Sequence, residues 1–216
     1  ESRGLGDVYK RQVLEIDDRR IFSYENIYFD TPELWFFTQH QNGKLNRFKA
    51  RKRKYVESGY SFFEIKFKSN NSRTIKARVQ GVDFDGQLDE KERSLLSQSA
   101  MPKTEQLQAS MNIDFSRITF ASKTLKDRAT LDLRLCVSNG EHTKQFENMV
   151  IAEVKQDKAS SDSAFVKALQ ACGVKEMRVS KYCVGILCTY SNVKYNRFKP
   201  RIRRINKLLD LSLIHI

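Results

Sequence analysis

The chain has little of what disulfide-stabilised, zinc-binding or membrane-spanning proteins require. It contains four cysteines and three histidines in 216 residues, and no two cysteines form a Cys-x-x-Cys pair. A zinc site is therefore not expected, and the cysteines are predicted to be reduced, mostly buried thiols, as is usual in the cytosol. The longest apolar run, residues 182–190, is far shorter than the about 20 residues that a membrane-spanning helix needs. These absences favour a cytoplasmic protein.

The two ends of the chain correspond to each other as DNA. Residues 7–12, DVYKRQ, can be encoded by GAT GTG TAT AAG AGA CAG, and the reverse complement of that DNA encodes LSLIHI, which is the sequence of residues 211–216. The pair resembles one transposon end, of the kind used in sequencing libraries, read in its two orientations. Residues 1–12 and 211–216 are therefore predicted to be adapter-derived or non-native. Residues 13–210 are predicted to be one domain, as a fragment open at both ends.

Negative charge is also scarce, and positive charge is concentrated. The chain has 39 Lys and Arg against 26 Asp and Glu, a net charge of +13, and eleven of the cations lie between residues 47 and 78. Arg47, Lys49, Arg51 and Arg53 recur at a spacing of two, which places them on one face of a strand. Like charges that crowd one face repel each other. The pattern predicts an acidic partner, most naturally a polyanion.

Most of the chain alternates in the same way, with one apolar face and one polar face rich in Arg and Lys. Strands are predicted at residues 26–30, 44–56, 60–68, 73–79, 117–121, 128–135 and 150–155, with hairpin turns at 42–43 and 139–140. Helices are predicted to begin at Thr31-Pro32 and to cover residues 90–98, 103–109, 160–172 and 181–190. Two architectures fit: a half-buried sheet with its polar face in water, or a barrel with charges in its lumen and helices outside. The cation excess favours the barrel.

These residues resemble the catalytic domain of the vacuolar transporter chaperone (VTC) polyphosphate polymerases, in particular its bacterial relatives, within the triphosphate tunnel metalloenzymes. The matching motifs occur in family order: Tyr28-Phe29-Asp30-Thr31, Arg47-x-Lys49-x-Arg51-x-Arg53-x-Tyr55, Phe63-Glu64-Ile65-Lys66, Arg117-Ile118-Thr119, Arg128-Ala129-Thr130-Leu131-Asp132, Glu153-Val154-Lys155 and Ser180-Lys181-Tyr182. The resemblance implies an α+β fold, namely an antiparallel β-barrel that forms a basic tunnel with flanking helices. The family domain begins with a strand upstream of this chain, so the barrel is predicted to lack its first strand, a truncation that can inactivate the fragment.

The resemblance also implies a set of site residues. The residues expected to bind substrate phosphates are Lys49, Arg51, Arg53, Lys66, Arg117, Arg128, Arg178 and Lys181. Lys66, Arg178 and Lys181 are the implied catalytic residues among them. The implied ligands of a divalent metal, Mn²⁺ or Mg²⁺, are Glu153 and Glu64.

The residues themselves leave alternatives open for several of these positions. Lys49 fits the tunnel lumen or its rim, and Glu64 and Glu153 fit counter-charges for neighbouring lysines as well as metal ligands. Asp132 is expected to pair structurally with Arg128 or Arg134. Lys52 and Lys54 face away from the row of cations and are expected to be solvated.

The implied reaction is transfer of the γ-phosphate of ATP to a growing polyphosphate chain. Phosphoryl transfer depends on positioning and charge stabilisation, and arginine forks match phosphate oxygens bidentately. Two alternatives stay open: hydrolysis of inorganic or nucleoside triphosphates, and non-catalytic binding of polyphosphate or RNA. Nucleic acid is not favoured, because the aromatic residues Phe48, Phe63 and Phe67 lie on apolar faces and not among the cations, where bases would stack. The sequence specifies neither membrane partner proteins nor an oligomeric state.

Overall fold

The computed structural model describes residues 11–71, 73–122, 127–156 and 163–209. Within that part, the strands form one antiparallel sheet surrounded by helices, which confirms the α+β class. The strands are β1 (Arg11–Val13), β2 (Ile21–Asp30), β3 (Arg47–Tyr55), β4 (Ser61–Lys68), β5 (Thr74–Gln80), β6 (Gln108–Ser122), β7 (Arg128–Ser138), β8 (Thr143–Phe146) and β9 (Ile151–Lys155). The α-helices are α1 (Trp35–Gln41), α2 (Glu90–Ser97), α3 (Ala164–Ala171), α4 (Lys181–Thr189) and α5 (Lys199–Leu208), with a 3₁₀ turn at Thr104–Gln106. Of the residues predicted to be adapter-derived or non-native, 1–12 and 211–216, the described part includes only Arg11 and Gln12, which pair with β6 as part of β1.

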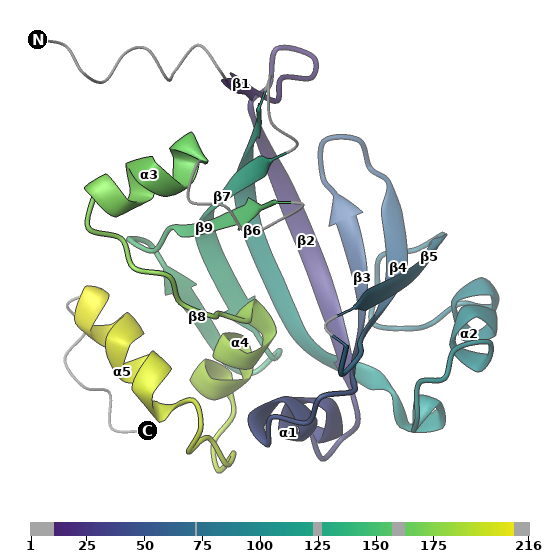
Figure 1. Ribbon diagram of the computed structural model, residues 1–216. Coiled ribbons are helices and arrows are strands. Elements are labelled where there is room, and N and C mark those ends of the chain that lie inside the picture. Colours follow the sequence, from purple (N-terminus) through teal and green to yellow (C-terminus); the bar gives the residue numbers. More distant parts are fainter. Residues whose placement is uncertain (1–10, 72, 123–126, 157–162, 210–216) are drawn as a thin grey trace, which may run out of the picture.

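The sheet follows the order β5-β4-β3-β2-β6-β7-β8, with β1 paired to β6 and β9 paired to β7. It is curved, so that β3, β4 and β5 turn away from β6 and β7 (Figure 1). Among the described residues no pairing joins β5 to β8 or β9. The antiparallel sheet is therefore as predicted, but these strands leave it open and do not close the ring of a barrel.

Side chains alternate between two faces of the sheet, which we name by their residues. The cation face carries Lys49, Arg51 and Arg53 of β3, and the apolar face carries Ala50 of β3 and Phe63 of β4, both at most 1% exposed. The apolar face packs on α2. Burial of these large apolar side chains is the main favourable contribution to the stability of this half of the sheet.

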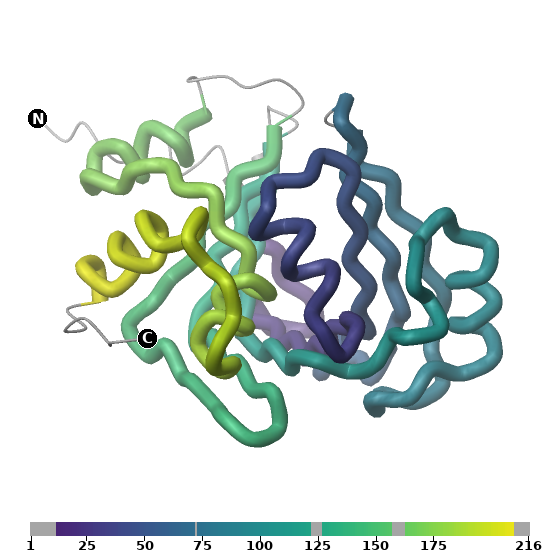
Figure 2. The backbone as a smooth tube through the Cα atoms, turned by 90° about the horizontal axis from the view of Figure 1, so that it is seen from below, coloured from purple at the N-terminus to yellow at the C-terminus, as the bar shows by residue number. Residues whose placement is uncertain are grey.

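At one end of the cation face the side chains are apolar, and there α4 packs on β6, β7 and β8. There Met111, Ile113 and Val137 are at most 2% exposed and contact Ile186 of α4 within one hydrophobic cluster. Figure 2, viewed from this end, shows α1 crossing the end of the sheet, with α2 on one side and α3 and α5 on the other. Of these helices, α1 and α4 contact each other and the strands at this end of the sheet.

Several local predictions need correction. The helix α1 begins at Trp35 and not at Pro32, although Thr31 accepts a hydrogen bond from the Trp35 amide at 3.1 Å. The turn at residues 42–43 joins α1 to β3, so it is no hairpin. Residues 103–109 hold a 3₁₀ turn and the start of β6, a strand of 15 residues that pairs with β2 from Gln108 to Ile118.

Lys52 is buried, so the prediction that it is solvated is wrong. Its side chain lies on the apolar face with 2% exposure, and its Nζ is 3.0 Å from Glu92 and 3.5 Å from Asp85. The cause is α2, which covers this face and brings Glu92 against the strand. Lys54 stays partly exposed, with its Nζ 3.3 Å from the carboxylate of Glu25.

Candidate functional site

The pairing of β2, β3 and β4 sets the geometry of the cation face. Arg51 lies opposite Tyr28 on one side and Glu64 on the other, while Lys49 lies opposite Lys66. Lys66 in turn lies opposite a further lysine of β5. Like charges directly opposite each other are unfavourable in a sheet, so a bound anion would relieve the repulsion between these lysines.

Arg51 is fixed by its two neighbours in the sheet. Its Nε and Nη2 lie 2.7 and 2.6 Å from Oε2 of Glu64, and its Nη1 donates to the phenol oxygen of Tyr28 at 3.0 Å. Burial alone would raise the pKa of Glu64, but the charge of Arg51 outweighs it and lowers that pKa. Glu64 therefore acts here as a counter-charge, as one of the two alternatives proposed, but its partner is Arg51 and not a neighbouring lysine.

Arg53 lacks a carboxylate partner among the described residues. Its Nε donates to Oδ1 of Asn26 at 2.9 Å, and Asn26 donates in turn to the carbonyl of Ile113 at 2.7 Å. Burial lowers the pKa of Arg53, and the charge of Arg51 lowers it further. The neutral amide thus orients Arg53 without cancelling its charge, which stays available to a phosphate.

The two lysines of this group are half-buried, and no described carboxylate forms an ion pair with either. Burial lowers the pKa of Lys66, and the charge of Arg51 lowers it further, to about 8. Lys49 donates from Nζ to Oγ of Ser180 at 2.9 Å, at the first turn of α4. Of the two positions that the sequence left open for Lys49, this contact supports the interior of the face.

A second cluster joins β6, β7 and α4. Arg117 donates to both oxygens of Asp132, from Nε at 2.5 Å and from Nη2 at 2.9 Å, and Lys181 of α4 donates to the same carboxylate. Burial alone would raise the pKa of Asp132, but the hydrogen bond from Arg117 and the charge of Lys181 lower it. The expected structural pairing of Asp132 thus exists, but with other partners than Arg128 or Arg134.

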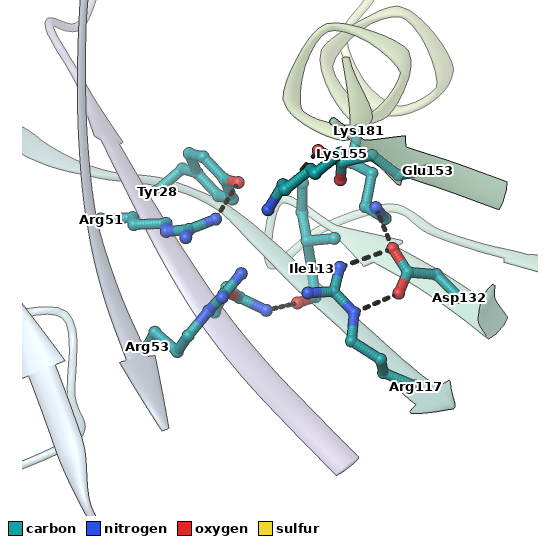
Figure 3. Close-up of polar contacts among 10 residues, drawn as sticks. Tyr28, Arg51, Arg53, Ile113, Arg117, Asp132, Glu153, Lys155 and Lys181 are labelled. Atoms are coloured by element: carbon teal, nitrogen blue, oxygen red, sulfur yellow. Dashed lines mark hydrogen bonds and ion pairs between the residues drawn. The ribbon is translucent and has the colours of Figure 1, made fainter. Parts of the chain in front are cut away.

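The close docking of α4 carries Lys181 over the cation face. A Cβ atom at Gly185 would lie 2.9 Å from Sδ of Met111, so a larger residue at this position would require the Met111 side chain to shift. Figure 3 shows Lys181 and Arg117 on one side and Arg51 and Arg53 on the other, with Tyr28 near Arg51. Cations from two strands and one helix therefore surround one region of the face.

Not every predicted residue joins this group. Arg178 is exposed in the segment that precedes α4, and Arg128 is exposed on β7, opposite Lys155 of β9. Glu153 lies opposite Thr130 and is half exposed, with one carboxylate oxygen 3.6 Å from Nζ of Lys155. Arg128 and Glu153 still share the cation face with Arg117, because alternate residues of paired strands point the same way.

A divalent metal ion would need carboxylate oxygens that are not already paired with cations. Within the described part of the chain, no group of three or more His, Cys, Asp or Glu side chains could hold a metal ion. Glu64 and Asp132 are bound by cationic side chains, and Asp30 is bound by backbone amides and by the hydroxyl of Tyr182. Among the described residues, Glu153 has Lys155 as its one ion-pair partner. Mg²⁺ commonly binds through one or two carboxylates together with substrate phosphates and water. Glu153 fits that mode of binding but not a site built from protein ligands alone.

Sequence reasoning missed two residues that the structure places at the centre of the site. Asn26 orients Arg53, and the phenol of Tyr28 contacts Arg51. Burial alone would raise the pKa of Tyr28, but the charges of Arg51 and Lys49 outweigh it and lower that pKa to about 7. The available signal was the alternation of polar and aromatic side chains along β2, at every second position from residue 24 to residue 30.

Two hollows of the surface lie away from these residues. One of about 500 Å³ is lined by residues 15 and 18–21, and one of about 360 Å³ is lined by residues 86–88, 93 and 107–109. Neither includes a predicted site residue. No helix of the described residues is long and apolar enough to cross a membrane.

Comparison with known proteins identifies one family and several solved structures of low sequence identity. The model of the VTC domain matches residues 7–190. A Pyrococcus horikoshii protein is similar at 14% identity and a TM-score of 0.46, over 83% of this chain and 88% of that one. A candidate adenylyl cyclase from Hippeastrum, described as having a dominant triphosphatase activity, is similar at 13% identity and a TM-score of 0.44. The similarity covers 82% of this chain and 88% of that one. A candidate adenylate cyclase from Vibrio parahaemolyticus is similar at 12% identity and a TM-score of 0.44, over 81% of this chain and 84% of that one. No curated protein matches the chain.

Proposed function

Because the chain belongs to the VTC domain family, we propose that it is a metal-dependent phosphotransferase that moves the γ-phosphate of ATP to a growing polyphosphate chain. The observation that carries the proposal is the group formed by Arg51, Arg53, Lys66 and Lys181, which lies on one face beside Arg117. A triphosphate and a phosphate chain are both polyanions. A face that carries cations from several strands and a helix can attract both the triphosphate and the phosphate chain.

In the proposed reaction, a terminal phosphate oxygen of the chain attacks the γ-phosphorus of ATP. A new P–O bond forms, the bond from the γ-phosphorus to the β,γ-bridging oxygen breaks, and ADP leaves, so the chain grows by one phosphate. No protein nucleophile is needed, since such transfer depends on positioning and on stabilisation of charge.

The roles of the residues follow from their contacts. Arg51 and Arg53 are oriented by Glu64 and Asn26 and would bind phosphate oxygens through their remaining N–H groups. Lys66 would add a mobile positive charge. Asp132 holds Arg117 and Lys181 together, which would place two cations on the phosphate that is transferred.

A divalent ion would neutralise charge on the phosphates, and Glu153 would be its protein ligand. Burial would lower the pKa of Arg117, but the hydrogen bond with Asp132 raises it. The charge of Glu153 raises the same pKa by a smaller amount, which indicates that Glu153 is near Arg117. The predicted metal role of Glu64 is less compatible with its bond to Arg51. We therefore assign the metal to Glu153.

The test is an incubation of the protein with ATP and Mn²⁺ or Mg²⁺, followed by a gel stained for polyphosphate. We expect a ladder that disappears on chelation and in the variants Arg51→Ala and Arg117→Ala. Lys54→Ala is the matched control, because Lys54 belongs to the same strand but points to the opposite face. Free phosphate without a ladder would indicate a hydrolase, and tight binding of polyphosphate without either product would indicate a binding module.

A further inference from the structure

Tyr28 lies within the cation face, and the proposed reaction gives it no role. Its ring is 8% exposed and stacks on Tyr182 with centroids 5.2 Å apart. Its phenol oxygen accepts a hydrogen bond from Nη1 of Arg51 at 3.0 Å. A guanidinium can only donate, so the phenol proton is not used in this contact, and no described residue accepts it.

The charges around this phenol are mostly positive. From β3 they are Arg51, Lys49 and Arg53, which act on Tyr28 directly. The neighbouring β4 contributes Lys66 and Glu64, and the carboxylate is bound to Arg51.

The other elements that pack against Tyr28 carry charges that are already paired, since Lys181 of α4 and Arg117 of β6 are both bound to Asp132. On α4, Tyr182 uses its hydroxyl to contact Asp30, which also accepts backbone hydrogen bonds from the start of α1. On β6, the residue opposite Tyr28 is the apolar Met111. The phenol therefore lies in a field of cations whose natural ligand is an anion.

We propose that Tyr28 is a ligand for phosphate oxygens and that binding of a phosphate chain is linked to the uptake of one proton by its phenol oxygen. In the free protein the surrounding cations favour the phenolate. A bound phosphate chain neutralises them and would be repelled by a phenolate, so the oxygen takes a proton from solvent and donates the new O–H to a phosphate oxygen. One O–H bond forms at Tyr28, and no other covalent bond changes. The inference rests on the proposed function, because it requires that this face bind phosphate chains.

The pH dependence has a definite sign. The pKa of Tyr28 is about 7 in the ligand-free protein, and an anion in contact with the phenol raises it. Affinity is then greatest below about pH 7 and falls, by up to about tenfold per pH unit, as the pH rises from there to the pKa of the bound state. Above that value both states carry the phenolate, and affinity no longer changes for this reason.

The test compares Tyr28→Phe with the wild-type chain and with Tyr24→Phe. Phenylalanine keeps the ring and its stacking, and Tyr24 is a matched control because it lies on the same strand and face, yet burial raises its pKa. Inorganic tripolyphosphate is titrated calorimetrically from about pH 6 to about pH 9 in buffers of different ionisation enthalpy. The titration of the ligand itself is common to all three proteins and cancels in their ratios.

We expect the wild-type chain and Tyr24→Phe to take up as much as one proton more than Tyr28→Phe near pH 7 to 8, with a matching loss of phenolate absorbance. The ratio of the wild-type affinity for tripolyphosphate to that of Tyr28→Phe should fall by up to about tenfold per pH unit above about pH 7. Equal proton uptake by wild type and Tyr28→Phe overturns this inference while the proposed function stands. If none of the three proteins binds tripolyphosphate, the proposed function is wrong, and this inference with it.

Discussion

Arg117 of β6 and Asp132 of β7 face each other in register, and the guanidinium donates to both carboxylate oxygens at 2.5 and 2.9 Å. Lys181 of α4 shares the same carboxylate, whose side chain is fully buried. One aspartate thus ties a helix to the sheet and gathers two cations of the candidate site. Stability and function are linked at this point, because removal of the carboxylate would leave both cations unpaired.

We predict that Asp132→Asn lowers the free energy of unfolding by about 3 kcal/mol at neutral pH. The pKa of Asp132 is below its usual value in the folded state, so the stability contributed by its charge is present above the unfolded pKa, about 3.9, and is lost as the pH falls through the folded value. The free energies of unfolding of wild type and Asp132→Asn are measured with urea at pH 7 and in acid. The difference between the two values should become smaller below about pH 4.

The control is Asp114→Asn on β6. Burial, followed by the charge of Glu25, raises the pKa of Asp114, so its charge costs stability at neutral pH and the amide should cause no comparable loss. Equal losses in the two variants, or a loss in Asp132→Asn that does not depend on pH, would contradict the pairing described above.

Lys66→Met should stabilise the ligand-free protein while it weakens phosphate binding. The pKa of Lys66 is lowered to about 8 by burial and by Arg51, so the charged amine opposes folding at pH 7. We expect a gain of about 1 kcal/mol in the free energy of unfolding. The gain should disappear as the pH rises from about 8 towards the unfolded value of about 10.4, because wild-type Lys66 then loses its charge.

This prediction is checked by thermal and urea unfolding at several pH values, beside tripolyphosphate affinity. Lys76→Met on β5 is the matched control, since Lys76 lies opposite Lys66 but is exposed. A Lys66→Met protein that is less stable than wild type at pH 7 would show that its charge has a favourable partner in the folded state.

Glu153→Gln should raise the metal concentration needed for half-maximal activity by at least about tenfold. Glu64→Gln should leave that concentration near the wild-type value, because Glu64 neutralises Arg51 and is not expected to reach the metal. It should instead tighten the metal-free binding of tripolyphosphate, since one negative charge leaves the face. The reverse result, with metal dependence changed in Glu64→Gln alone, would assign the metal to β4.

The buried pair behind the cation face offers a prediction about stability alone. Lys52→Met leaves Glu92 fully buried without its cation, and the free energy of unfolding should fall by about 3 to 5 kcal/mol. The double variant Lys52→Met with Glu92→Leu should recover much of that loss, because two apolar side chains of similar size replace the pair. A double-mutant cycle measures the coupling, and additive losses would show that the two residues act independently.

The sequence determined the local pattern of this protein. Alternation over residues 47–53 and 63–67 was sufficient to predict which side chains share a face, because successive side chains of a strand point to opposite sides. Phe63 was predicted to lie in the core and is fully buried. The family resemblance, carried by short motifs in order, is confirmed by the match over residues 7–190.

Only the tertiary structure decided which of these residues meet. Asp132 binds Arg117 and Lys181 because of the register of β6 against β7, which shifts between Asp114 and Ser116, and because α4 docks on the sheet. Lys52 is buried because α2 brings an acidic side chain against the back of its strand. Strand periodicity fixes the direction of a side chain along its own segment, but contacts between distant segments depend on register and on helix packing, which arise only when the whole sheet assembles.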